Sequence, residues 1–202
     1  MKNINIVYID DIIDPMLTRY LREKYDSKDH RNYRTFYEEV NFDSNNNYQE
    51  LINKELVRSA NIILIDNHLF EEQSVSSKFS GKQFKIILRK LFPYIEVIVI
   101  TQDESIEGEK IVKKFSDPDI SKVNVYYDKN LFPVIENSIK EVIEFDNLLV
   151  DLESNLDVEK LLVEKIRNSI NGMDFYDELK KEDIDDLIRM FKEIKNELRS
   201  EQ

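Results

Sequence analysis

Short apolar runs that each end at a polar residue constrain this 202-residue chain more than any other feature. They cover residues 4–9, 61–65, 96–100 and 123–127 and are mostly β-branched or aromatic. The runs at 61–65 and 96–100 are almost wholly apolar, as strands covered on both faces of a sheet require. Residues 33–40 carry aromatic side chains without clean alternation and are a further strand candidate.

Amphipathic stretches separate these runs. Apolar residues recur at spacings of three and four, the period of a helix, in residues 12–25, 48–57, 84–91 and 133–149. Pro133 suits a first helical turn. This alternation predicts an α/β fold, with a parallel sheet covered by helices on both faces. In such sheets ligands bind beyond the carboxyl ends of the strands.

Composition excludes several classes of protein. Three glycines leave no Gly-rich phosphate loop, and the lack of cysteine excludes disulfides, thiolate nucleophiles and Cys-ligated metals. His30 and His68, the only histidines, are too few for a poly-His metal site. The net charge of −12 disfavours binding to phosphate backbones and anionic lipid. With no signal-peptide pattern and no apolar stretch of about 20 residues, we expect a cytoplasmic protein without a membrane segment.

Residues 151–202 differ from the first 150 and are predicted to form an acidic helical extension, with nine basic and fifteen acidic residues. Ser154-Asn155-Leu156-Asp157 matches a capping box, and Asn171-Gly172 matches a helix stop. Apolar stripes follow at Leu162, Ile166 and Ile170, and at Ile184, Leu187, Phe191, Ile194 and Leu198. These stripes could pack on each other, on the first domain, on a protein partner or on a second copy of the chain. A net charge of −6 argues against a DNA-binding output.

A polar residue lies at the carboxyl end of most strand candidates. The first ends in Asp10-Asp11, that at 61–65 in Asp66, that at 96–100 in Thr101, and that at 123–127 is followed by Lys129. In a parallel sheet these residues would meet at one edge. Crowded carboxylates repel, so a hard cation such as Mg²⁺ would neutralise them. A carboxylate beside Mg²⁺ and a lysine can attack a phosphoryl group.

Each residue also has a simpler interpretation. Asp10 and Asp11 could cap the helix that begins near residue 12, and Asp66 could form an Asx turn with Asn67. Thr101 and Lys129 are uninformative alone. The hypothesis of a shared site depends on all of them together.

The segments 6–11 (IVYIDD), 63–66 (ILID), 99–101 (VIT) and 126–129 (YYDK) together resemble the receiver domain of two-component response regulators. The resemblance covers residues 1–150 and implies a flavodoxin-like (βα)5 parallel sheet. It implies that Asp66 is the phosphoacceptor and Asp11 a direct Mg²⁺ ligand. It also implies that Asp10 acts through metal-bound water and that the backbone carbonyl of His68 completes the ligands.

The same resemblance assigns a switch. Thr101 would hydrogen-bond a phosphoryl oxygen, and Lys129 would pair with another. Tyr126 would be the aromatic residue whose rotamer follows activation. Occupancy of the site would then alter the face formed by the fourth strand, the fourth helix and the fifth strand.

The resemblance implies a phosphoacceptor rather than a turnover enzyme, with a histidine kinase or phosphotransfer protein as partner. The chain departs from the family at Phe70, Gln102 and Asn130, where Pro, a small residue and Pro are usual. These departures favour an alternative, a scaffold or interaction module that works without phosphorylation. A third interpretation is an aspartate-nucleophile phosphatase of the haloacid dehalogenase type. That chemistry needs a second Asp as acid and base two residues after the nucleophile, and this chain has His68 there.

Overall fold

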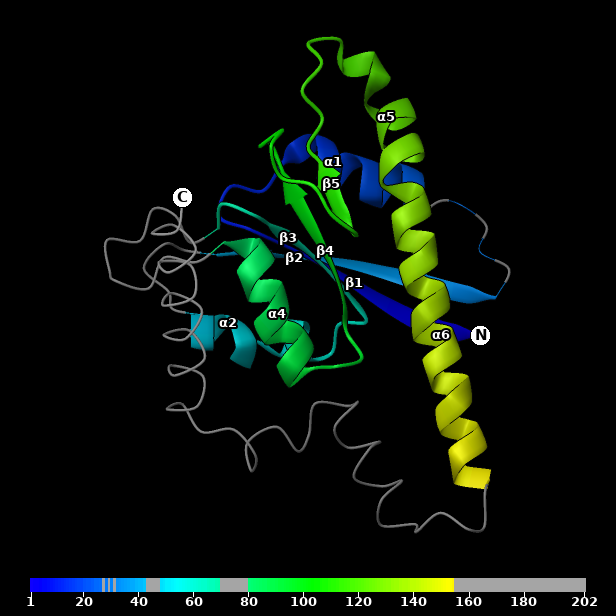
Figure 1. The fold of residues 1–202 in the computed structure, drawn as a ribbon. Helices are drawn as coiled ribbons and strands as arrows, with labels where there is room; N and C mark the ends of the chain where they lie inside the picture. Colours follow the sequence, from blue (N-terminus) through cyan, green and yellow to red (C-terminus); the bar gives the residue numbers. More distant parts are fainter. Residues whose placement is uncertain (27, 29, 31, 43–47, 70–79, 155–202) are drawn as a thin grey trace.

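The computed structural model describes residues 1–154, apart from 27, 29, 31, 43–47 and 70–79. Its centre is an all-parallel sheet of five strands in the order β2-β1-β3-β4-β5 (Figure 1). The strands are β1 (Lys2–Asp10), β2 (Tyr33–Asn41), β3 (Ile62–Asp66), β4 (Glu96–Thr101) and β5 (Ile111–Lys113). This order is that of flavodoxin-like folds, so the predicted fold class is confirmed.

Helical segments connect the strands and follow the last of them. They are α1 (Pro15–Arg19), the π-helical η1 (Tyr20–Tyr25), α2 (Tyr48–Asn53), α3 (Glu55–Arg58), α4 (Gly81–Leu91), the 3₁₀ turn η2 (Ile120–Lys122), α5 (Val123–Asn130) and α6 (Phe132–Ser154). Local sequence explains their starts. The Asp14 side chain caps α1 ahead of Pro15, and Ser80 forms a capping box with Gln83 at α4.

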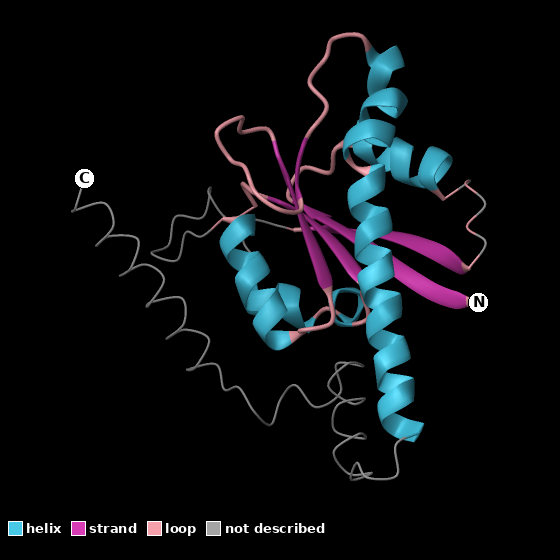
Figure 2. Cartoon of the chain, turned by 45° about the vertical axis from the view of Figure 1, so that its right-hand side comes forward, coloured by secondary structure: helices cyan, strands magenta, loops and turns pink. Residues whose placement is uncertain are grey.

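The sheet separates two apolar cores. One core joins alternate residues of β1, β3 and β4 to α2, α3 and α4. The other joins the remaining residues of these strands to α1, η1, α5 and α6. Figure 2 shows α4 and α6 on opposite sides of the sheet. All five residues of β3 are buried, as the continuous apolar run predicted.

The predicted strand at 123–127 is wrong, because these residues form α5. Val123, Tyr127 and Leu131 are fully buried at four-residue spacing, so a helical face meets the core. The fifth strand lies earlier, at Ile111–Lys113. Residues 102–110 connect β4 to β5 without a helix, so the expected switch face has no fourth helix.

The first-domain boundary expected at residue 150 lies inside α6, which continues to Ser154. The capping box, helix stop and apolar stripes predicted for the extension fall mainly or wholly on residues 155–202, outside the described residues, and stay predictions. No helix among the described residues is long and apolar enough to cross a membrane.

Candidate functional site

Three carboxylates meet at the carboxyl edge of the sheet. Asp10 ends β1 and Asp66 ends the adjacent β3, with exposed fractions of only 1% and 3%. Asp11 follows Asp10, and one oxygen from each of the three side chains lies within 4.8 Å of the others. The predicted convergence of these residues is therefore confirmed.

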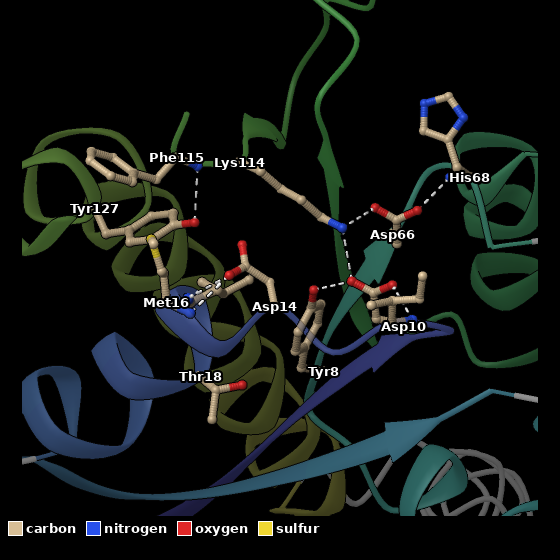
Figure 3. A network of polar contacts seen from close by, with 12 residues as sticks. Tyr8, Asp10, Asp14, Met16, Thr18, Asp66, His68, Lys114, Phe115 and Tyr127 are labelled. Carbon is tan, nitrogen blue, oxygen red and sulfur yellow. Dashed lines mark hydrogen bonds and ion pairs between the residues drawn. The ribbon is translucent and has the colours of Figure 1, made fainter. Parts of the chain in front are cut away.

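The cation of the site is Lys114, which follows β5 directly. Its Nζ lies 2.7 Å from Oδ1 of Asp66 and 2.9 Å from Oδ2 of Asp10, so it bridges both carboxylates (Figure 3). The expectation that Lys129 follows the fifth strand is wrong. Lys129 lies near the end of α5 with an exposed side chain, because the run before it is helical.

Burial and charge perturb the pKa values of two groups at this edge. The pKa of Asp11 is raised, first by burial and then by the hydrogen bond and charge of Asp10, with a further contribution from Asp66. Burial alone would lower the pKa of Lys114. Its hydrogen bonds and charge interactions with Asp66 and Asp10 outweigh that effect and raise it. The site therefore keeps Lys114 charged and still has unrelieved repulsion at Asp11.

Backbone and side-chain donors hold the two buried carboxylates in place. Oδ1 of Asp10 accepts the N–H of Ile12 at 3.1 Å, and Oδ2 accepts the hydroxyl of Tyr8. Oδ2 of Asp66 accepts the N–H of His68 at 2.6 Å. The expected role of the His68 carbonyl as a metal ligand stays a prediction.

The two predicted switch residues have different positions. Thr101 ends β4 as expected and is fully buried, and its Oγ1 accepts the N–H of Asp103 at 3.1 Å. Tyr126 lies in α5, so the prediction that it belongs to the fifth strand, three residues before the lysine of the site, is wrong. Its hydroxyl donates to the carbonyl of Lys113 at 3.1 Å, and it therefore braces β5 from α5.

A pocket of about 520 Å³ opens over this edge. Its polar wall consists of the three carboxylates and Lys114, with His68 and Gln102 beside them. Its other wall is largely apolar and consists of Ile12, Ile13, Pro15, Met16 and Phe115, with Asp14. Gln102, which departs from the family pattern, thus reaches the pocket itself.

The residues of the pocket fit a magnesium ion by their chemistry. Three carboxylates offer the hard oxygen ligands that Mg²⁺ prefers. Burial, followed by the hydrogen bond and the charge of Asp10, raises the pKa of Asp11, and a bound cation would relieve the repulsion between the carboxylates. Lys114 already neutralises part of the charge on Asp10 and Asp66, so the ion and the ammonium would share these two carboxylates.

No protein-family model matches the chain, and no curated protein has a similar sequence. Among solved structures, one similar chain is a two-component transcriptional regulator AraC from Clostridium phytofermentans. The TM-score is 0.39 at 17% identity, over 72% of this chain and 98% of that chain. Another is the RcsB response regulator of Salmonella typhimurium, with a TM-score of 0.38 at 17% identity, over 96% and 99% of the two chains. Both TM-scores lie below 0.5.

Sequence reasoning missed Lys114 and Tyr8. Lys114 was missed because the apolar run before it consists of only two residues, Ile111 and Val112, which is too short to indicate a strand. The signal for Tyr8 was its position two residues before Asp10, since side chains two apart on a strand share a face. A tyrosine there points its hydroxyl along the strand toward the carboxylate.

Proposed function

We propose that this chain is a receiver-like signalling protein that accepts a phosphoryl group on Asp66. The observation that carries the proposal is the meeting of three carboxylates and Lys114 at the carboxyl edge of the sheet. In this proposal Asp11, Asp10 and Asp66 hold Mg²⁺. The chain modifies itself once and then acts through a protein partner, so it is not a turnover enzyme.

In the proposed step, an oxygen of Asp66 attacks the phosphorus of a phosphohistidine donor. The new O–P bond forms while the P–N bond breaks, and the electron pair stays on the imidazole nitrogen, which takes up a proton. Mg²⁺, when bound, supplies positive charge where phosphoryl oxygens gather negative charge. Lys114 lies beside Asp66 and adds a second positive charge there.

The test is modification by a small acyl phosphate, with Mg²⁺ present, followed by intact-protein mass spectrometry. We expect one added phosphoryl group on the native chain and none on Asp66→Asn. Beryllofluoride, which mimics the acyl phosphate, should bind the native chain under the same conditions. If the native chain gains no phosphoryl mass and binds no beryllofluoride, the proposal is wrong.

A matched pair of lysine variants tests which cation serves the site. Lys114→Ala should slow modification by about tenfold or more, because a positive charge is lost where negative charge develops. Lys129→Ala should leave the rate unchanged, since this side chain is exposed on α5. The reverse result would contradict the assignment of Lys114.

A second candidate function is an interaction scaffold that works without phosphorylation. Two observations favour it: Lys114 already pairs with both buried carboxylates, and the 102–110 connection has no helix to carry a switch. In that case the chain would bind its partner equally well as native protein and as Asp66→Asn. For either function we propose a protein partner rather than DNA, because the chain carries a net charge of −12.

A further inference from the structure

Tyr8 is a buried tyrosine whose hydroxyl reaches the candidate metal site from inside the fold. Its exposed fraction is 0%, and its ring belongs to the core shared with α1, η1, α5 and α6. The hydroxyl donates a hydrogen bond to Oδ2 of Asp10 (Figure 3). A phenol keeps its proton at neutral pH, and an ionised carboxylate can only accept, so Tyr8 is the donor in this hydrogen bond.

The hydrogen bonds of Asp10 limit what it can offer a cation. An ionised carboxylate has about four lone-pair positions. Oδ2 accepts both Tyr8 and Lys114, and Oδ1 accepts the N–H of Ile12. These three donors use three of the positions, and when Asp11 is ionised and no longer hydrogen-bonds Asp10, one position on Oδ1 is left for a cation.

We propose that Tyr8 is a positioning residue that restricts Asp10 to a single contact with a cation and thereby favours Mg²⁺ over Ca²⁺. The inference rests on the proposed function, because it concerns the cation of that same site. Mg²⁺ takes octahedral geometry and keeps bound waters, so one lone pair or one bridging water from Asp10 suffices. Ca²⁺ takes about six to eight oxygens and favours bidentate carboxylates, which the Tyr8 hydrogen bond opposes.

The test measures dissociation constants for Mg²⁺ and for Ca²⁺ by calorimetric titration of the full chain. In Tyr8→Phe a lone pair of Oδ2 is released. We expect the affinity for Ca²⁺ relative to Mg²⁺ to rise by about threefold or more. Tyr20→Phe is the matched control. Tyr20 is equally buried and its hydroxyl donates to Asp128 at 2.9 Å, away from the carboxylates of the site, so its loss should leave the ratio unchanged.

Two further measurements separate positioning from damage to the fold. Thermal unfolding without divalent ions should show a single cooperative transition at a lowered temperature for both Tyr8→Phe and Tyr20→Phe, since each loses one tyrosine–carboxylate hydrogen bond and keeps its fold. On an Asp10→Asn background, Tyr8→Phe should no longer change the ion ratio, because its effect passes through Asp10. Native binding with an unchanged ratio in Tyr8→Phe overturns this inference alone. A native chain that binds neither ion overturns the proposed function and this inference with it.

Discussion

The carboxylates and the lysine of the candidate site are held in place by different kinds of interaction. Asp10 and Asp66 end two central strands that each pair with neighbours on both sides. Lys114 follows a strand of three residues that, within the described part of the chain, pairs only with β4 and buries only Val112 of its own residues. The acidic side of the site is therefore fixed by the apolar cores, and the lysine side has little core of its own.

Hydrogen bonds hold the lysine side in place, where little apolar core does so. The N–H of Lys114 donates to the carbonyl of Thr101 at 2.7 Å. The next residue, Phe115, donates its N–H to the hydroxyl of Tyr127 at 3.1 Å, and Tyr126 holds the carbonyl of Lys113. Single substitutions should therefore disturb the two sides to different extents. A pair of glycines compares the two sides, and three further comparisons test the contacts of the lysine side.

The largest difference is expected between two glycines. A Cβ at Gly81 would lie 2.1 Å from the carbonyl oxygen of Asp66, so Gly81→Ala forces β3 and α4 apart. We expect a loss of about 3 kcal/mol or more in the free energy of unfolding. Gly108, on the lysine side, has φ +149 and its Cβ would meet only the Ile111 side chain at 3.2 Å. Gly108→Ala should cost about 1–2 kcal/mol. Urea denaturation measures both, and a greater loss for Gly108→Ala would contradict the comparison.

Two adjacent lysines provide the next comparison. Lys114→Ala leaves two buried carboxylates without their shared counter-charge, and we expect it to lower stability by about 3 kcal/mol without metal. Millimolar Mg²⁺ should restore part of that loss, so its stabilising effect should be larger than in the native chain. Lys113 bonds the carbonyls of Asp103 and Ile106 instead. Lys113→Ala should cost about 1 kcal/mol, and Mg²⁺ should not restore it. Equal Mg²⁺ increments in thermal melts of the two variants would contradict this reading.

The acidic side of the site was predictable from sequence because its strands carry mostly apolar runs that end at a polar residue. The strands that end at Asp10 and Asp66 have nine and five residues, most of them buried, whereas β5 has three. The polar residue that follows such a run then lies at the sheet edge by geometry alone. Thr101 was placed in the same way at the end of β4.

The lysine side was mispredicted because two signals competed there. A strand of three residues is too short to show a period, whereas residues 123–127 are rich in the β-branched and aromatic residues that strands favour. Tertiary packing decided the outcome. Val123, Tyr127, Leu131 and Ile135 continue one helical face into α6, and this longer pattern outweighs local β propensity.

A smaller effect is expected from two neighbouring tyrosines of α5. Tyr127→Phe leaves the N–H of Phe115 without its acceptor in a buried place, which should cost about 1–2 kcal/mol. Tyr126→Phe frees the carbonyl of Lys113 at a half-buried place, where water can replace the hydroxyl, and should cost less than about 1 kcal/mol. Hydrogen exchange at Phe115 should quicken in Tyr127→Phe and not in Tyr126→Phe. Equal exchange in both variants would show that Tyr127 does not hold the start of the segment after Lys114.

The smallest effect is a pH dependence confined to the 102–110 connection. The pKa of Asp103 is lowered, first by the hydroxyl of Ser105 and then by the backbone N–H of Ser105. A carboxyl whose folded pKa lies below its unfolded value adds stability above that unfolded value, about 3.9. This contribution is lost as the pH falls through the folded pKa. Asp103→Asn should therefore be less stable than the native chain at pH 6, and the difference should shrink toward pH 3.

Ser105→Ala tests whether the Ser105 hydroxyl causes the shift. In that variant an NMR titration should find the pKa of Asp103 returned toward its ordinary value. An unchanged titration in Ser105→Ala would mean that the Ser105 hydroxyl is not what lowers the pKa of Asp103 in the connection that stands where a fourth helix was expected.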